Sequence, residues 1–378
     1  MNKLFISSAL FLTAYTAAAT AAPMGRAPVY AGAISAHNIA TIQHSIFNMA
    51  NDGFDTIGLH VGAPEPRAIT ATSDAPNAPA KAPRTTADST KLYGHMPMYG
   101  TMSMYGEYGD DGIIFAPGRS GGDIATPTLH TWATAAYFTD DEKFDHLRSV
   151  HTKTTAAMAG IGTARARLGA GFATFGGYAG YAGGTQRNSQ IDLTQNSAFV
   201  GGYASYHIGR FITSGTMTLG KMYSDLDKKF GDTDFDNLWL GLGVGAAYDI
   251  LLDPTFTLQP GLTLGYTWVN ADDYKIGDHR ITNENLSVYE IAPALRAIKH
   301  ISNGWFASLG AKYVIRFSDG GDVKTDHHSI SELDPDNYAE YGVSLEKSIG
   351  AFTGTASIGR RDGGRSGWNG SINLKYIF

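Results

Sequence analysis

The sequence contains no cysteine in its 378 residues. Without a thiol, the chain can form no disulfide bond, no thiolate metal site and no cysteine nucleophile. This absence excludes the small disulfide-rich secreted folds and the thiol-dependent enzymes. The folded state must therefore be stabilised by packing, hydrogen bonds and ion pairs alone.

Long apolar runs and a large net charge are also missing. After residue 22, no stretch approaches about 18 uninterrupted apolar residues, which excludes a helical membrane protein. The net charge of −6 argues against a nucleic-acid partner. The mean hydropathy of −0.16 resembles that of a soluble protein. It still allows a membrane barrel, because half of each barrel strand faces the lumen and is polar.

The first residues have the composition of an export signal. Lys3 is followed by an apolar run over residues 4–14 and by a stretch of small residues that ends at Ala22. This arrangement predicts a secretory signal peptide over residues 1–21. We therefore expect an exported protein.

Alternating apolar and polar side chains recur throughout residues 129–378. Successive side chains of a strand point to opposite faces, so such a segment has one apolar face and one polar face. The clearest example is residues 256–268, where apolar side chains alternate with polar or small ones without exception. Twelve segments of strand length can be distinguished, at residues 130–138, 153–167, 170–183, 197–208, 210–223, 237–250, 256–268, 289–297, 305–317, 340–346, 351–361 and 368–378.

The connections between these segments alternate in length. The turn at residues 251–254 is short. The polar and charged connections are longer, at residues 139–152, 184–196, 224–236, 271–285, 319–336 and 362–367. Short turns at one end and long loops at the other are typical of outer-membrane barrels. We therefore predict an all-β fold, a transmembrane antiparallel β-barrel of about 12 strands over residues 129–378.

Charged residues within the strand segments fall on the polar face. A charge in the hydrocarbon of the bilayer costs roughly 2–4 kcal/mol at the midplane, so these side chains are expected to face the lumen. The predicted lumen-facing charges are Glu290, Arg296, Lys312, Arg316, Glu340 and Glu346.

Residues 22–128, which precede the barrel, have a different pattern. Apolar residues recur at helical spacing, which predicts an amphipathic α-helix over residues 35–52. Residues 62–88 are rich in Ala, Pro and Thr and are predicted to be a linker. A Met-x-Met-Tyr-Gly unit repeats within residues 96–109. Whether residues 96–116 add a strand to the barrel or line its pore is left open.

The last strand carries a family resemblance. It reads Gly-x-x-x-x-x-Tyr-x-Phe, with Tyr376 and with Phe378 as the final residue. Together with the segments before it, this strand resembles the C-terminal translocator barrel of Gram-negative autotransporters. The resemblance implies that Tyr376 and Phe378 are an assembly signal, that the 35–52 helix plugs the lumen, and that the protein resides in the outer membrane.

The resemblance also implies the partners and the function. It implies a monomer surrounded by lipid bilayer and lipopolysaccharide, inserted with the help of periplasmic chaperones and the barrel assembly machinery. The expected function is to translocate or display a short N-terminal region at the cell surface, with residues 23–60 or the Met-Tyr-Gly segment exposed. The alternative is a plugged porin-like or adhesin-like barrel that acts through its extracellular loops. No cofactor is expected.

Three groups of residues are candidates for chemical sites. Some autotransporters cleave their passenger at an asparagine of the plug, which makes Asn48 and Asn51 candidates, with Glu290, Glu340 or Glu346 as the acids. The preferred interpretation is that these acids pair with lumenal cations. His300 and Ser302 have the spacing of a lipase pair, and His327 and His328 lie in an acidic loop, but both are better explained by chance and by solvent exposure. We therefore predict no enzyme and no metal site.

Overall fold

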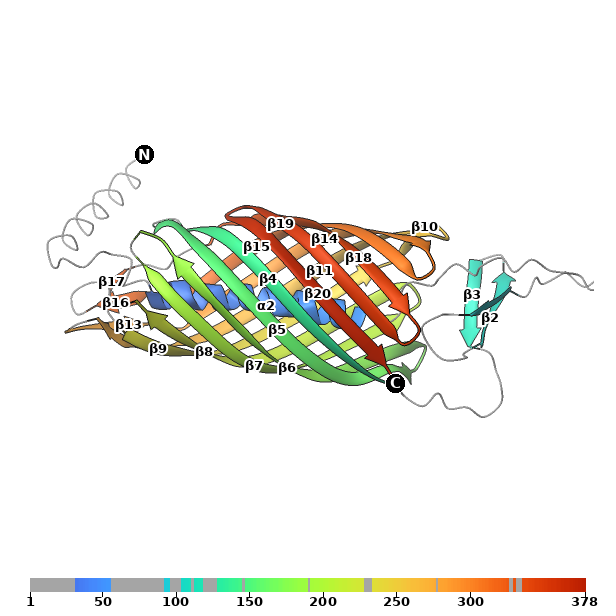
Figure 1. Cartoon of the computed structure of the whole chain (residues 1–378), viewed down its shortest axis with the longest axis horizontal. Coiled ribbons are helices and arrows are strands. Elements are labelled where there is room, and N and C mark those ends of the chain that lie inside the picture. Colours follow the sequence, from blue (N-terminus) through green and yellow to red (C-terminus); the bar gives the residue numbers. More distant parts are fainter. Residues whose placement is uncertain are drawn as a thin grey trace, which may run out of the picture.

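The computed structural model describes residues 31–55, 92–95, 103–109, 112–117, 128–144, 147–189, 191–227, 233–276, 278–325, 329–330 and 335–378. Within this part of the chain, 12 long antiparallel strands close into a barrel around one helix (Figure 1). The predicted fold class is therefore confirmed. No described helix is both long and apolar enough to cross a membrane. The predicted signal peptide and the 62–88 linker lie outside the described residues.

Each barrel strand pairs with the strands that precede and follow it around the wall, and β20 pairs with β4 to close the ring. Closure leaves no wall strand with an open edge, so the backbone groups are paired where no water can reach them. Each of the 12 predicted segments overlaps one of these strands, and at least one end of each strand differs from the predicted one by one or more residues. The strands are β4 (Thr128–Phe144), β5 (Leu147–Leu168), β6 (Gly171–Arg187), β7 (Asp192–Ile208), β8 (Phe211–Leu226), β9 (Thr233–Tyr248), β11 (Phe256–Ala271), β14 (Leu286–Ser302), β15 (Trp305–Gly320), β18 (Tyr338–Ile349), β19 (Phe352–Gly363) and β20 (Arg365–Ile377).

The predicted loop at residues 139–152 is wrong. Strands β4 and β5 stay paired as far as Phe144 and Leu147, so only two residues separate them. The prediction took charged residues as a sign of solvent. Asp140 and Glu142 instead continue the alternation and are buried inside the barrel, where cations neutralise them.

Part of the predicted loops at residues 271–285 and 319–336 is also regular structure. These residues contribute strands β12 (Tyr274–Ile276), β13 (His279–Asn283), β16 (Val323–Thr325) and β17 (Ser329–Ile330). The four strands form a separate small sheet at one end of the barrel (Figure 1). A further short strand, β10 (Ile250–Asp253), pairs with β11 at the opposite end.

The lengths of the connections orient the barrel. At the end that carries Phe378, tight turns join the strands, except for the connection that contains β10. The two longest connections, one with β12 and β13 and the other with β16 and β17, lie at the other end. The turn after β14 needs positive φ at both central residues, which Asn303 (48°) and Gly304 (74°) adopt. Because outer-membrane barrels keep short turns in the periplasm, we assign the Phe378 end to the periplasm and the end with β12, β13, β16 and β17 to the exterior.

The helix α2 (Ala31–Asp55) runs along the barrel axis inside the lumen (Figure 1). It extends beyond the predicted 35–52 range at both ends. Every side chain from Ala31 to Ala50 is buried except that of Asn48, which is partly buried. A surface helix buries only one face, whereas α2 is buried on all sides because the barrel wall encloses it.

Two glycines of β9 make room for the helix. A Cβ atom on Gly243 would lie 2.1 Å from Phe47, and one on Gly241 would lie 2.0 Å from Gln43. Both distances are shorter than any normal contact between carbon atoms, so a larger residue at these positions would displace the side chains of Gln43 or Phe47. The glycine run of β9 is therefore a packing surface for the helix.

The open question about residues 96–116 is resolved by strand pairing. Strands β1 (Leu92–His95), β2 (Ser103–Gly109) and β3 (Gly112–Pro117) form a three-stranded antiparallel sheet of their own. None of them belongs to the sheet that forms the barrel wall. The described part of the Met-Tyr-Gly segment is thus a separate β element.

Because alternate side chains of each strand face the lipid, the cost of placing an arginine on the outer face should depend on its depth in the membrane. Val200, in the middle of β7, is 58 % exposed on the outer surface, whereas Ile208, at the periplasmic end of the same strand, is 40 % exposed. Val200→Arg should lower the free energy of unfolding by about 2–4 kcal/mol, and Ile208→Arg by about 0–1 kcal/mol. Reversible urea unfolding in lipid vesicles measures both values. Equal losses for the two variants would contradict the assigned membrane position.

Candidate functional site in the barrel lumen

One face of α2 points to a charged wall. His37, Thr41 and His44 are spaced by four and three residues and therefore lie on the same face of the helix. The wall opposite is formed by β14, β15, β18, β19, β20 and β4, which carry the charged lumenal residues described next.

His44 is bonded to two neighbouring strands of this wall. Its Nδ1 atom lies 2.8 Å from the Glu290 Oε2 atom on β14. Its Nε2 atom lies 3.0 Å from the Lys312 Nζ atom on β15. The His44 side chain is only 4 % exposed. The helix is therefore tied to the wall through a buried imidazole with both nitrogens engaged.

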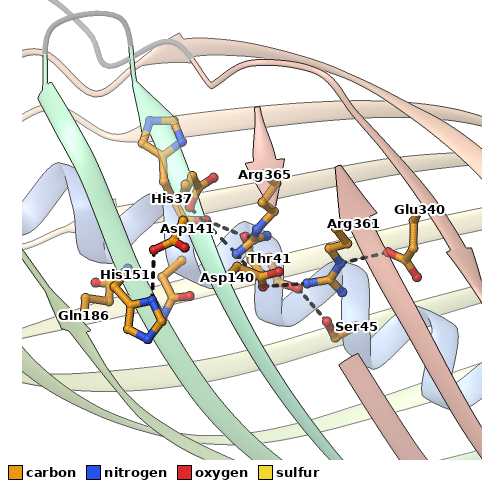
Figure 2. A network of polar contacts seen from close by, with 12 residues as sticks. His37, Thr41, Ser45, Asp140, Asp141, His151, Gln186, Glu340, Arg361 and Arg365 are labelled. Carbon is orange, nitrogen blue, oxygen red and sulfur yellow. Dashed lines mark hydrogen bonds and ion pairs between the residues drawn. The ribbon is translucent and has the colours of Figure 1, made fainter. Parts of the chain in front are cut away.

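From Lys312 the ion pairs continue across the next strands. The Lys312 Nζ atom lies 3.3 Å from Glu340 Oε1 on β18. Glu340 Oε2 accepts a hydrogen bond of 2.9 Å from Nε of Arg361 on β19. Figure 2 shows the Arg361 guanidinium between Glu340 and Asp140, to which it donates over 2.8 Å. Gly367 lies between Arg361 and Asp140 in the strand register and has no side chain to obstruct this contact.

From Asp140, further ion pairs lead back to Glu290, the partner of His44. Arg365 on β20 lies 3.5 Å from Asp140 and 3.8 Å from Glu142, both on β4. Glu142 accepts a hydrogen bond of 2.7 Å from Arg316 on β15. The Nε atom of Arg316 lies 3.4 Å from Glu290. These contacts close a circuit, which we call the ionic ring: His44, Glu290, Arg316, Glu142, Arg365, Asp140, Arg361, Glu340 and Lys312.

The ionic ring is balanced in charge. Its carboxylates and its cationic side chains alternate around the circuit, and a neutral His44 adds no net charge. Arg316 is 1 % exposed and Asp140 is 0 % exposed, and ions this deeply buried are stable only when they are paired. Arg365 also donates a hydrogen bond to Thr41 of α2, which ties the helix to the ring a second time (Figure 2).

Strand register explains how the ring assembles. Four of its contacts join residues that are direct cross-strand partners: Glu290 with Arg316, Lys312 with Glu340, Glu340 with Arg361, and Arg365 with Glu142. Opposite charges at directly opposed positions stabilise strand pairs. One of these contacts crosses from β20 to β4, so the ring also spans the seam at which the barrel closes.

The opposite face of α2 is held by uncharged groups. The Ser35 and Ser224 hydroxyl oxygens are 2.9 Å apart. Asn38 donates a hydrogen bond of 2.6 Å to Gln195, and Asn237 donates one of 2.9 Å to Ser35. One face of the helix thus bonds to charged side chains, and the opposite face bonds to amide and hydroxyl groups. This difference fixes the rotation of the helix in the lumen.

Four of the six predicted lumenal charges belong to the ionic ring, namely Glu290, Lys312, Arg316 and Glu340. Arg296 lies outside the ring and donates a hydrogen bond of 3.2 Å to the Ser308 hydroxyl. Glu346 is 3 % exposed and accepts a 3.4 Å hydrogen bond from Thr355.

The other predicted residues lie away from the ring. Asn48 follows His44 by one helical turn, and Asn51 is in α2 with its side chain outside the described residues. The Tyr376 ring packs 4.9 Å from that of Phe378. The His300 ring packs 4.7 Å from Phe306. The exposed Ser302 lies at the end of the strand, and residues 327–328 are outside the described part of the chain.

Sequence reasoning missed five members of the ring: His44, Asp140, Glu142, Arg361 and Arg365. Asp140, Glu142 and Arg365 fall in the predicted loops 139–152 and 362–367, because charged residues near Gly or Asp are typical of loops. The second loop prediction is also wrong, since β19 ends at Gly363 and β20 begins at Arg365. The alternation of the strand could have identified Asp140 and Glu142, because residues two positions apart share a face and Phe138, on the same face, is buried.

The fold and the filled lumen define a plugged outer-membrane β-barrel. The sequence matches the model of the autotransporter β-domain family over residues 131–358, so the chain belongs to that family. It is thus a translocator barrel of the Gram-negative outer membrane, with the lipid bilayer around it. No curated protein matches the sequence.

Solved autotransporter barrels share this fold. The β-domain of Bordetella BrkA has a TM-score of 0.55 and 15 % identity, covering 66 % of this chain and 100 % of that one. The translocator domain of NalP from Neisseria meningitidis has a TM-score of 0.54 and 14 % identity, covering 68 % and 90 %. The transport unit of AIDA-I from Escherichia coli has a TM-score of 0.54 and 15 % identity, covering 68 % and 94 %.

Two neighbouring arginines test the energetic role of the ring. Arg361 points inward to Asp140 and Glu340, whereas Arg360 points outward and pairs with Asp362, with 41 % of its side chain exposed. Arg361→Met should lower the free energy of unfolding by about 3–5 kcal/mol, because it leaves buried carboxylates unpaired. Arg360→Met should cost at most about 1 kcal/mol. Urea unfolding in vesicles compares them, and similar losses would rule out a special role for the ring.

Proposed function

We propose that this barrel displays a short segment that precedes α2 at the cell surface, with α2 retained in the lumen as the plug. The observation that carries this proposal is the direction of the helix. At its start, the amide of Gly32 lies 3.4 Å from the Tyr274 hydroxyl, on the small sheet of the exterior end. Further along, Phe47 packs on Gly243 of the barrel wall. The helix therefore runs inward from the exterior.

This direction separates the N-terminal region into two parts with different locations. The chain before Ala31 leaves the helix at the exterior end. The chain after Asp55 leaves it from the inner end and returns to Thr128, which begins β4 at the periplasmic end. The proposal therefore assigns residues 22–30 to the surface and residues 56–127, with the Met-Tyr-Gly segment, to the periplasmic side. Of the two segments expected at the surface, residues 23–60 and the Met-Tyr-Gly segment, only the part of the first that precedes α2 remains a candidate.

Assembly follows from the same proposal. Phe378 donates its backbone N–H to the Leu129 carbonyl over 2.9 Å, beside the seam between β20 and β4. We propose that Tyr376 and Phe378 serve as the signal read by the barrel assembly machinery after delivery by periplasmic chaperones. The barrel is proposed to act as a monomer in contact with lipopolysaccharide. Cleavage at Asn48 or Asn51 stays a prediction.

A second function is favoured by one observation. The sheet of β12, β13, β16 and β17 stands at the exterior end of the barrel (Figure 1) and packs on wall strand β9, where the Tyr274 and Phe235 rings stack 4.7 Å apart. A folded loop sheet offers a fixed surface, which suits an adhesin-like barrel that binds through its extracellular loops. In that case, deleting residues 274–283 should abolish binding of the cells to the surface that the loops recognise, while the β-barrel still assembles.

Labelling of single cysteines tests the display proposal, and the chain has no native cysteine to interfere. Ala27→Cys should react with a membrane-impermeant maleimide on intact cells. Ala80→Cys should react only after the outer membrane is permeabilised. Matched controls are Ser189→Cys on the exterior and Ser302→Cys at the periplasmic end of β14, both exposed in the structure.

The outcomes separate the possible topologies. Protection of Ala27→Cys in cells where Ser189→Cys reacts would refute surface display. Reaction of Ala80→Cys in intact cells, with Ser302→Cys protected, would refute the proposed direction of the helix.

A further inference from the structure

The bonding of His44 fixes its protonation state. The Lys312 ammonium can only donate hydrogen bonds, so the His44 Nε2 atom, 3.0 Å away, must accept. The Nδ1 atom then carries the hydrogen and donates to Glu290 over 2.8 Å. An imidazole with one donor and one acceptor is the neutral form. No nitrogen of the latched ring is left to take up a proton.

The surroundings of His44 oppose a positive charge. The titratable and charged groups that face it are Glu290 from β14, Lys312 and Arg316 from β15, and Tyr338 and Glu340 from β18. Both carboxylates already have cationic partners in the ionic ring, Arg316 for Glu290 and Lys312 and Arg361 for Glu340. Protonation would break the bond to Lys312 and leave two cations in contact, with one uncompensated charge in a buried ring.

We propose that His44 is a proton-sensitive latch between the plug helix and the barrel wall, closed at neutral pH and released by acid, so that acidification opens the lumen to ions. In the chemical step, a proton from solvent binds the lone pair of His44 Nε2, and Lys312 keeps its ion pair with Glu340. This inference goes beyond surface display and does not depend on which segment is displayed.

The direction and size of the effect follow from proton linkage. An imidazole in water binds its proton near pH 6.5, whereas the latched ring has no site for it. Below that pH the released state binds more protons than the latched state, so acid favours release. Between about pH 7.5 and about pH 5, the ratio of released to latched barrels should rise by at most about 30-fold.

Conductance of the purified full-length chain in planar lipid bilayers measures the open fraction. The open probability of the wild type should rise by about 10- to 30-fold between about pH 7.5 and about pH 5. His44→Gln cannot be protonated and should show no rise. His151→Gln is the matched control, because His151 also pairs with a carboxylate, Asp141, but 43 % of its side chain is exposed. It should retain the rise.

A second variant, Lys312→Gln, and a disulfide that locks α2 to the barrel wall test the proposal independently of His44→Gln. Lys312→Gln removes the cation that His44 would meet on protonation, so its pH response should flatten even if His44→Gln fails to insert. The Ser35 and Ser224 hydroxyls are 2.9 Å apart, so a Ser35→Cys/Ser224→Cys disulfide should hold the helix in place. The oxidised lock should abolish conductance at about pH 5, and a reductant should restore it.

Three results would overturn the latch. They are a wild type whose conductance does not rise with acid, an unchanged rise in both His44→Gln and Lys312→Gln, and acid conductance that persists in the oxidised lock. The last result would assign the response to the loops and not to the helix.

Discussion

Buried charge must be paired, and the architecture of this barrel depends on that constraint. Charged side chains cannot face the hydrocarbon, so the alternation of the strands turns them into the lumen. There the filling helix excludes most water, and each ion needs a partner. The ionic ring meets this need with contacts between adjacent strands, one of which joins β20 to β4. The same pairing that neutralises the lumen thus also bridges the seam of the barrel and holds the plug.

The helix and the wall are complementary over two kinds of surface. On one side, His44 and Thr41 bond to the ionic ring. Elsewhere, Gly241 and Gly243 leave space for the side chains of Gln43 and Phe47. α2 combines polar and apolar residues around its whole circumference, which suits neither water nor lipid alone. The lumen satisfies both classes, and this explains why a helix that could not span a membrane by itself is stable inside one.

The fold could be predicted from sequence because the period of two along a strand is a local property. The segment at residues 256–268, for example, identifies its own lipid-facing and lumen-facing sides. The ionic ring could not be predicted in the same way. Asp140 and Arg361 meet across 221 positions of the sequence, and Thr41 and Arg365 across 324. Their meeting depends on register and closure. Asp140 was further hidden because a charged residue near a strand end is more often in solvent. The direction of α2, which determines what is displayed, depends equally on tertiary contacts.

Hydrogen–deuterium exchange of the α2 amides in membrane-inserted, full-length protein tests the central claim most directly. If the helix is held in the lumen by the ionic ring and its polar contacts, its amides from residues 35–50 should exchange at neutral pH as slowly as those of the neighbouring wall strands. An isolated helix in water opens readily and exchanges orders of magnitude faster. Fast exchange of α2 within a protected barrel would contradict the account, because the plug would then be a transient occupant of the lumen.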